Sequence, residues 1–470
     1  MKTRFVCLGM ALIGLGSAPL FAENYVVLYP GSIPSTASKS IQRAGGTVRY
    51  SYPQIGVVIA NSTSSTFASL LSQDKTVEGV SATSNFASQI KVETEVLTGA
   101  AQVATSVPWG TEPLSGLQWD MVQIQVPEAH AITGGSPSII VGDLDSGVDY
   151  THPDLAANID FTNSVSCLGG VPNQDPTAWN DDNGHGTHTA GTIAAAANGI
   201  GIVGVAPGVK LAAVRVANAD GYIFPEAAIC GFMWAAAHSL DVINNSYFVD
   251  PWLFNCRNDA SQRPIWKAVR RAVSFAISNG VVVVASMGNE NMDLSKTNID
   301  TLSPDFPPGS GVARVVTNAC AVIPVEVPGV IGVSADGNLL QKSYYSSYGV
   351  GVTQLVAPGG DRRFQNTAPT HRGYVLSTFP GGRYALAQGT SMAAPHVTGV
   401  AALVLSQRYR PPGAVAGVLN STADPIPCPP NPFSPGPPYD YEAICAGGDG
   451  YNGFYGHGQV NAYRAVTGSR

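Results

Sequence analysis

The stretch GTSMAAP at residues 389–395 places Ser391 at the start of a long apolar run that continues to residue 407. The glycine and small residues permit a tight turn and close approach of another backbone, and the run itself predicts a helix. Two earlier stretches, LDSG at 144–147 and NGHGTH at 183–188, supply a carboxylate and an imidazole. The order along the chain is therefore acid, base, nucleophile. Because the same three groups follow other orders on unrelated folds, this order predicts a fold as well as a chemistry.

Apolar segments alternate with segments of helical periodicity from about residue 109 onwards. The pattern predicts strands at 138–143, 210–216, 241–245, 281–284 and 330–335, and helices at 185–197, 225–239, 265–279 and 391–407. The VVVV run at 281–284 is typical of a strand that is buried on both faces. We therefore expect an α/β fold with a mostly parallel, doubly wound sheet and helices on both faces. The proline-rich residues 411–438 are expected to form neither regular helix nor central strand.

The residues Asp145, His185 and Ser391 are expected to meet, because polar groups collect at the carboxyl ends of parallel strands. A serine hydroxyl attacks only when a base takes its proton, and histidine has a pKa near neutrality that suits this task. A buried carboxylate fixes the tautomer of the histidine and stabilises its charged form. Each residue alone has a plainer interpretation, as a turn aspartate or as a helix N-cap serine. Asp143 and Asp149 are local alternatives to Asp145.

A fourth group, Asn289, follows the apolar strand and is preceded by Gly288. Acyl transfer creates an oxyanion, and a pre-placed amide stabilises that charge more than it stabilises the ground state. The plainer interpretation is a turn asparagine. His188 shares a helix with His185, a spacing that also suits a metal pair, but no third ligand accompanies them. We therefore interpret His188 as a structural, hydrogen-bonded histidine.

The first residues predict export. Lys2 and Arg4 precede an apolar run at 5–18 that is short for a membrane span, and small residues precede a cut after Ala22. We assign residues 1–22 to a signal peptide and expect a secreted, extracellular protein with no membrane association after its removal. A retained amphipathic anchor is the alternative.

Composition narrows the class of protein. Of the 470 residues, 44% are apolar and only 12% are charged, which suits a compact globular chain rather than a disordered one. The net charge is −7 and no basic run occurs, so nucleic-acid binding receives no support.

Three further segments follow the signal peptide. Residues 23–84 have the order βαββαβ, which predicts a small ferredoxin-like α/β domain. Residues 85–108 are polar, with little periodicity, as expected for an exposed and cleavable linker. Residues 109–470 carry the predicted sheet and all the candidate site residues.

The cysteines after the signal peptide are even in number, which favours disulfides in an exported chain. They are Cys167, Cys230, Cys256, Cys320, Cys428 and Cys445. Six cysteines allow fifteen pairings, and none has the paired spacing of a zinc ribbon. We expect Cys428–Cys445 and Cys230–Cys256, because each pair closes a loop of moderate length in a segment that looks irregular.

The stretches described above resemble the signature segments of subtilisin-like serine proteases (subtilases) over about residues 109–465. The resemblance implies a helix-flanked sheet and endopeptidase activity on protein or peptide substrates. It gives the four catalytic roles to Asp145, His185, Asn289 and Ser391. It also implies that residues 23–84 are an inhibitory propeptide, which acts as chaperone and inhibitor until self-cleavage in 85–108.

Two departures from the family affect the substrate and metal sites. The family's substrate-binding strand reads like Asn-Met-Ser-Leu-Gly, whereas residues 244–248 here read NNSYF. The expected substrate-binding residues are Ser246, Tyr247, Phe248 and Gly288. Tyr247 and Phe248 either cap the pocket for the residue before the scissile bond or pack beneath the adjoining insertion, and both interpretations stay open.

The second departure concerns calcium, which many relatives use for stability. The ANGIG stretch at 197–201 resembles the family's calcium loop, with Asn198 and the supporting acid Asp154 as side-chain ligands. Calcium needs six to eight oxygens, so backbone carbonyls would supply the others. No acidic partner near the mature N-terminus is evident. The sequence is therefore compatible with a loop that binds calcium and with a loop that does not. No cofactor is required for the chemistry itself.

Two rival functions remain. The first is a binding protein that uses the same fold without catalysis. The second is a metal hydrolase that uses His185 and His188. The intact acid, base, nucleophile and amide argue against the first, and the missing third ligand argues against the second.

Overall fold

The computed structural model describes residues 22–83, 88–89, 93–97, 110–249, 252–304, 309–364, 373–439 and 442–469. The predicted signal peptide, apart from residue 22, and most of the predicted linker at 85–108 lie outside these residues. Across the described part of the chain, every helix is too short or too polar to cross a bilayer.

A seven-stranded parallel sheet forms the centre of the molecule. In spatial order its strands are β18 (Thr353–Pro358), β17 (Ile331–Asp336), β13 (Val282–Ser286), β11 (Val242–Asn245), β7 (Ile140–Asp145), β9 (Lys210–Arg215) and β8 (Val165–Ser166). All neighbouring pairs are parallel. The predicted doubly wound sheet is therefore confirmed, and the structure adds the edge strands β18 and β8.

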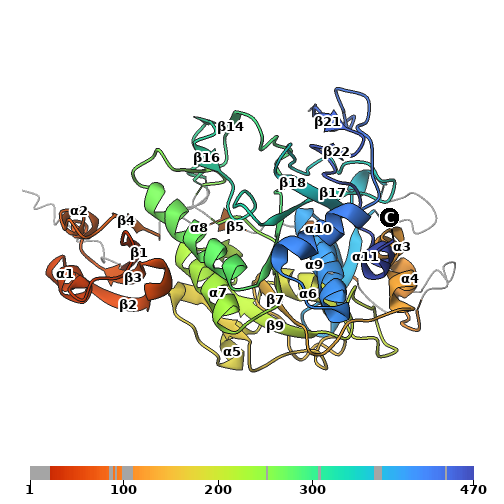
Figure 1. Ribbon diagram of the computed structural model, residues 1–470, viewed down its shortest axis with the longest axis horizontal. Coiled ribbons are helices and arrows are strands. Elements are labelled where there is room, and N and C mark those ends of the chain that lie inside the picture. The colour runs from red at the N-terminus through yellow and green to blue at the C-terminus, as the bar shows by residue number, and fades with distance from the viewer. Residues whose placement is uncertain are drawn as a thin grey trace, which may run out of the picture.

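Helices cover both faces of this sheet (Figure 1). They include α7 (Pro225–Ala237) and α8 (Arg263–Ser278) on one face, and α6 (His185–Ala194) and α9 (Thr390–Gln407) on the other. Val281 and Val283 pack into the core that contains α7 and α8, whereas Val282 and Val284 pack into the core that contains α9. Because side chains alternate along a strand, consecutive valines are needed to fill both cores.

One expectation about the C-terminal region is wrong. Part of the proline-rich stretch 411–438 forms the helix α10 (Pro412–Thr422). Pro411 precedes this helix and Pro412 lies in its first turn, where the missing N–H would have no intrahelical partner. Prolines at the start of a segment therefore do not exclude a helix.

A separate small unit precedes the sheet. Its elements are β1 (Glu23–Leu28), α1 (Ala37–Arg43), β2 (Gly46–Tyr52), β3 (Val57–Ser62), α2 (Phe67–Leu71) and β4 (Gly79–Ala82), and its antiparallel sheet has the order β2-β3-β1-β4. The unit lies against α7 and α8 (Figure 1). Glu78 pairs with Lys267 at 2.6 Å and with Arg271 at 2.7 Å, and Asn24 Nδ2 donates to Glu226 Oε1 at 2.9 Å.

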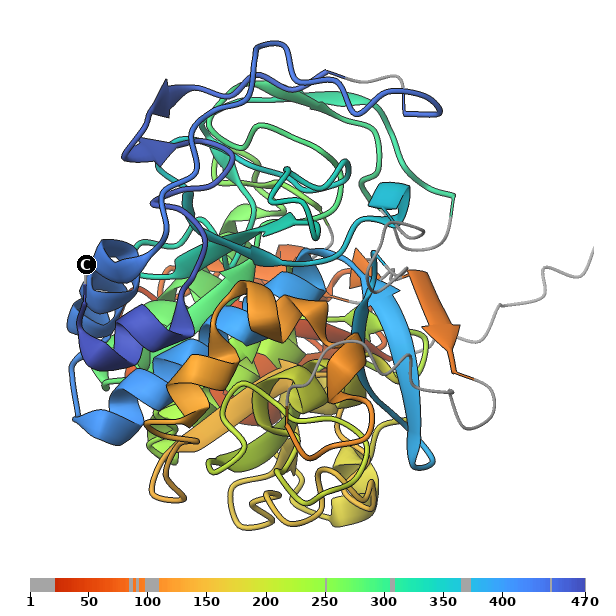
Figure 2. The ribbon, with the colours of Figure 1, turned by 90° about the vertical axis from the view of Figure 1, so that its right-hand side faces the viewer.

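Two short strands follow this unit and lie against the larger domain. The strand β5 (Ser88–Gln89) pairs with β10 (Tyr222–Ile223), and β6 (Glu93–Val96) pairs with β20 (Arg383–Gln388), which forms a hairpin with β19 (Val375–Phe379). Figure 2 shows β6 beside β20. Glu93 is opposite Gln388, which lies three residues before Ser391, so β6 begins close to the candidate site.

Three disulfides link the cysteines: Cys167–Cys230, Cys256–Cys320 and Cys428–Cys445. The structure has the expected Cys428–Cys445 bond, whereas the expected Cys230–Cys256 bond is wrong. Cys230 lies on α7 and reaches the segment after β8, while Cys256 and Cys320 lie opposite each other on paired strands. Spacing along the chain does not reveal these partners, because each of the two pairs joins positions more than sixty residues apart.

Candidate active site

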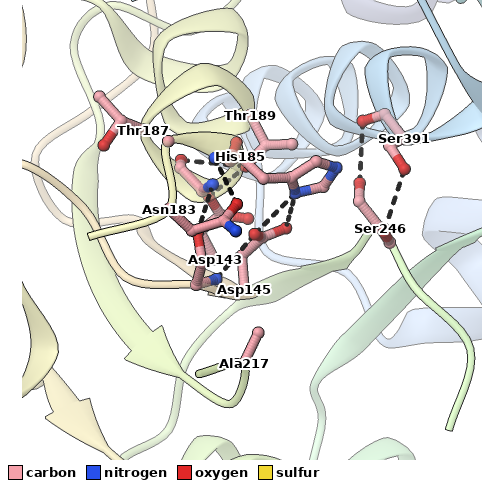
Figure 3. Close-up of polar contacts among 12 residues, drawn as sticks. Asp143, Asp145, Asn183, His185, Thr187, Thr189, Ala217, Ser246 and Ser391 are labelled. Atoms are coloured by element: carbon pink, nitrogen blue, oxygen red, sulfur yellow. Dashed lines mark hydrogen bonds and ion pairs between the residues drawn. The ribbon is translucent and has the colours of Figure 1, made fainter. Parts of the chain in front are cut away.

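Asp145 and His185 form a buried acid–base pair (Figure 3). Asp145 is the last residue of β7 and His185 is the first residue of α6. Nδ1 of His185 lies 2.7 Å from Asp145 Oδ1 and 2.8 Å from Oδ2, and the exposed fractions are 5% for the histidine and 0% for the aspartate. Gly184 has a φ of +107°, and a Cβ there would stand 2.4 Å from the Phe379 ring, so glycine is required at this turn.

Ser391 lies beside this pair, in the first turn of α9, and is 4% exposed. Its Oγ donates to the backbone oxygen of Ser246 at 3.1 Å, and Ser246 Oγ donates to the backbone oxygen of Ser391 at 2.9 Å. Nε2 of His185 points toward Ser391 (Figure 3) and is buried without a hydrogen-bond partner among the described residues. The acid–base bond is thus formed, whereas the serine hydroxyl donates to the backbone of Ser246 and not to Nε2 of His185. Catalytic hydrogen bonds are often long or absent in structures without substrate.

Asn289 is oriented by the residue before the serine. Its Oδ1 accepts hydrogen bonds from both N and Oγ1 of Thr390, each at 2.9 Å, and Thr390 Oγ1 accepts from Gly288 N at 3.1 Å. Because the amide oxygen is occupied in this way, the amide NH₂ is turned away from Thr390. Nδ2 lies 3.5 Å from the point that a Cβ would occupy if Gly389 had one. Gly389 is two residues before Ser391, so this amide lies near the nucleophile. Thr390 lies within the GTSMAAP stretch, but its contact with Asn289 has no signal in the sequence.

The expected substrate-binding residues separate into two groups. Ser246 and Gly288 lie next to Ser391 and Thr390. Tyr247 is buried in the core that contains α7 and α8, and its hydroxyl donates to Asn245 Oδ1 at 3.0 Å. Burial raises the pKa of Tyr247 well above its usual value. Phe248 packs against the same core, so for these two aromatic residues the structure favours packing beneath the insertion over capping a pocket.

The remaining histidines of the two motifs are engaged elsewhere. His188 is buried, with Nε2 3.1 Å from the backbone oxygen of Ala385, and burial lowers its pKa to about 3. His396 lies between the backbone oxygen of Met392, 2.8 Å from Nδ1, and Asp120 Oδ2, 2.9 Å from Nε2. Among the residues that the structure describes, no group of three or more His, Cys, Asp or Glu side chains is arranged to hold a metal ion.

The predicted calcium residues lie around one loop. Asp154 Oδ2 accepts from Ile202 N at 3.0 Å and from the Tyr384 hydroxyl at 2.8 Å, whereas Oδ1 is buried without a hydrogen-bond partner in the described part of the chain. Burial raises the pKa of Asp154. Asn198 is exposed, and its Oδ1 accepts from Ile200 N at 3.1 Å.

A second acid, which the sequence did not reveal, lies next to this loop. Glu112 is 5% exposed, and its Oε1 accepts from Gly199 N at 3.4 Å. A buried carboxylate oxygen without a partner, a second carboxylate and a loop of backbone carbonyls fit the oxygen chemistry that calcium prefers.

A cavity of about 250 Å³ borders the acid–base pair. It is lined by Thr94, Asn183, Gly184, His185, His188, Phe379, Ala387 and Met392. Thr94 belongs to β6, so the strand that follows the N-terminal unit forms part of the wall next to His185.

The order acid, base, nucleophile on an open parallel sheet separates this site from serine hydrolases of the chymotrypsin and α/β-hydrolase folds. It places the protein in the subtilisin-like class. The chain belongs to the subtilase family, whose family profile matches residues 136–458.

Individual relatives agree with this assignment. M-protease from Shouchella clausii is 34% identical over 319 residues, which are 67% of this chain but only 63% of M-protease. Subtilisin BL from Lederbergia lenta is 34% identical over 303 residues, or 64% of this chain and 85% of that protein. The match thus spans less than two thirds of M-protease.

Solved structures share the fold. The epidermin leader peptide processing serine protease from Staphylococcus aureus has a TM-score of 0.70 at 22% identity, covering 96% of this chain and 99% of its own. Fervidolysin from Fervidobacterium pennivorans, a keratinolytic enzyme related to subtilisin, has a TM-score of 0.67 at 24% identity, covering 95% of this chain and 61% of its own.

Proposed function

We propose that the protein is a secreted serine endopeptidase that cleaves protein or peptide substrates and is made as a self-processed zymogen. The observation that carries this proposal is the His185 ring, held by buried Asp145 through Nδ1 while Nε2 points toward Ser391. Export is supported by the predicted signal peptide and by three disulfides, which persist in oxidising compartments.

The reaction proceeds through an acyl-enzyme. Ser391 Oγ attacks the carbonyl carbon of the scissile peptide bond while its proton passes to Nε2 of His185, and Asp145 stabilises the imidazolium. Asn289 Nδ2 donates to the oxyanion of the tetrahedral intermediate. His185 then gives the proton to the leaving amine as the C–N bond breaks. Water repeats the attack on the ester with His185 as base and releases the acid product and Ser391.

A fluorophosphonate probe tests this function, because it forms a covalent bond only with an activated serine. We expect the probe to label one peptide, which contains Ser391. Any treatment that abolishes peptide hydrolysis should also abolish this labelling. Intact labelling and hydrolysis after treatment with a strong chelator exclude the metal hydrolase. Processed protein that neither labels nor hydrolyses peptides would favour the rival binding role and contradict the proposal.

The N-terminal unit is proposed to be the propeptide. It is docked through the Glu78 ion pairs and apolar contacts, and β5 and β6 pair with strands of the larger domain. Glu93 is opposite Gln388, and Thr94 borders the cavity beside His185, so β6 begins near the nucleophile. We place the first cut between Gln89 and Glu93, a narrower range than the linker at 85–108.

We also propose a structural calcium ion at the 197–201 loop. Asp154 Oδ1 and Asn198 Oδ1 would bind it, backbone carbonyls of the loop would complete the shell, and Glu112 would add negative charge. The bound ion would neutralise the buried carboxylate of Asp154 and so stabilise the fold.

Removal of calcium is expected to lower the melting temperature (Tm). We expect a chelator to lower the Tm of the wild-type chain and excess Ca²⁺ to restore it, whereas Asp154→Asn has the lower Tm with or without chelator. Asp175→Asn is the matched control, because the exposed Asp175 caps the short helix Pro176–Trp179, and its chelator response should equal that of wild type. An unchanged wild-type Tm in the presence of chelator would exclude the ion. Differential scanning calorimetry measures the Tm of the wild-type chain and of both variants.

A further inference from the structure

A second buried carboxyl group lies beneath the acid–base pair. Asp143 is two residues before Asp145 on β7, so both side chains project from the same face of the strand. Asp143 is fully buried. Its Oδ1 accepts from Asn244 Nδ2 at 2.9 Å, and its Oδ2 lies 2.7 Å from Thr189 Oγ1. The mechanism above does not use this group.

The two partners of Asp143 belong to elements that carry the base and the nucleophile. Thr189 lies one turn after His185 on α6 (Figure 3). Asn244 also donates to Ser246 Oγ at 3.0 Å, and Ser246 Oγ donates to the backbone oxygen of Ser391 at 2.9 Å. A continuous path of hydrogen bonds therefore runs from the helix of His185, through Asp143 and Asn244, to the helix of Ser391.

A second bond joins the same path to α9. Thr398 Oγ1, two turns beyond Ser391, is 3.3 Å from Asn244 Oδ1. Asn244 is thereby fixed in orientation, with its oxygen toward α9 and its NH₂ toward Asp143 and Ser246. The asparagine can present only an N–H donor to Asp143, so one oxygen of Asp143 must accept.

The hydrogen bonds around the other oxygen fit a neutral carboxyl group. Thr189 Oγ1 lies 2.7 Å from Asp143 Oδ2 and 3.0 Å from the backbone oxygen of Gly186. A protonated Oδ2 donates to Thr189 Oγ1, and the threonine proton is then free for Gly186, so every donor has an acceptor. An ionised Asp143 would take the threonine proton and leave Gly186 without it.

The surroundings also disfavour a second negative charge. The titratable groups around Asp143 are Asp145 on the same strand, Asp181 before α6, His185 on α6 and Tyr247 after β11. In the described part of the chain, no Lys or Arg side chain pairs with Asp143. Burial, followed by the charge of Asp145, raises the pKa of Asp143 well above its usual value.

We propose that Asp143 is a positioning residue which, as a neutral acid, connects α6 to β11 and α9 and so holds His185 in register with Ser391. This inference rests on the proposed function, because it assigns His185 and Ser391 their catalytic roles. Asp143 itself touches neither substrate nor the reacting atoms; it acts through Thr189 and Asn244. A neutral, buried carboxylic acid that donates a hydrogen bond is an established device in enzyme sites.

The first test compares an amide with an apolar residue at this position. Asp143→Asn keeps one acceptor and one donor, so we expect it to keep most of kcat at neutral pH and to move the alkaline limb of the kcat profile to higher pH. Asp143→Val removes both bonds, so kcat should fall by about tenfold or more with KM little changed, because the base is displaced rather than the substrate site. Equal losses of kcat in both variants would show that a charged carboxylate is required and overturn the proposal, as would full activity in Asp143→Val.

Thr189 supplies an independent check. Thr189→Ser keeps the hydroxyl between Asp143 and Gly186 and should retain kcat, whereas Thr189→Val has the same shape without it and should lose kcat as Asp143→Val does. Loss in the serine variant, or none in the valine variant, would contradict the path through Thr189.

A thermal measurement separates failure of this inference from failure of the proposed function. The Tm is measured in the full chain that also carries Ser391→Ala, which prevents self-digestion. This measurement does not depend on peptidase activity. Because the folded-state pKa of Asp143 is raised above the unfolded value of about 4, its contribution favours folding at low pH and is lost as pH rises toward the folded pKa. Asp143→Asn should therefore have the higher Tm at neutral pH, and the difference should shrink toward pH 4. A lower Tm for Asp143→Asn at neutral pH would refute the neutral acid even if no peptidase activity exists.

Discussion

The chain with Ser391→Ala is expected to accumulate at full length, without the cut between Gln89 and Glu93, and to lose peptide hydrolysis by about 10⁶-fold in kcat. That magnitude was measured for removal of the nucleophile in subtilisin, a relative of this protein. The reason lies in the covalent step: the proposed acyl-enzyme forms on the Ser391 hydroxyl, toward which Nε2 of His185 points. Oxyanion stabilisation and substrate binding alone supply the remaining rate.

Intact mass spectrometry of the purified chain measures the outcome. Wild-type protein should yield a fragment whose new N-terminus falls at residues 90–93, and active enzyme added to the Ser391→Ala chain should restore this cut. Ser421→Ala, which removes an exposed serine on α10, is the control and should mature as wild type does. Normal maturation of purified Ser391→Ala would show that Ser391 does not perform the cut.

The second large effect concerns Asp145→Asn, for which we expect kcat to fall by about 10⁴-fold with little change in KM. This is the size of loss known for the same substitution in trypsin. The buried carboxylate accepts from Nδ1 of His185 at 2.7 Å, so the ring carries its proton on Nδ1 and offers Nε2 as acceptor. An asparagine amide in the same place can donate to Nδ1, which favours the tautomer with the proton on Nε2. That tautomer cannot take the proton of Ser391.

Steady-state kinetics on a peptide substrate, with protein processed in trans, separates kcat from KM for this variant. Asp149→Asn is the control: Asp149 accepts from Thr151 N and Gly381 N and does not contact His185, so kcat should stay within a few-fold of wild type. If Asp149→Asn and Asp145→Asn lost equal activity, the assignment of the acid would be wrong.

The local patterns were sufficient to predict the main architecture and the three segments of the site. Strand and helix periodicity found β7, β13, α6 and α9 to within a few residues, because each has the burial pattern of its layer. Asp145, His185 and Ser391 could be named because each lies at a strand or helix end with a distinctive sequence.

Features that depend on contacts between distant side chains could not be predicted. Nothing in the sequence pairs Cys230 with Cys167, orients Asn289 through Thr390, or brings Thr189 to Asp143. In the sequence Asp143 was only a local alternative to Asp145; its environment comes from two other elements of the fold. The helix α10 was missed for a local reason, since its prolines lie at the one end of a helix that tolerates them.

The disulfide bond between Cys428 and Cys445 closes a loop near the C-terminus. Under the proposed function, one copy of the chain can cut exposed loops of another. A nick between these two cysteines leaves both new ends tethered through sulfur, so the polypeptide beyond residue 445, including the closing helix Ala462–Thr467, stays attached. A cut of this kind would appear on a gel only after reduction of the disulfide, and the cut chain would keep its C-terminal helix.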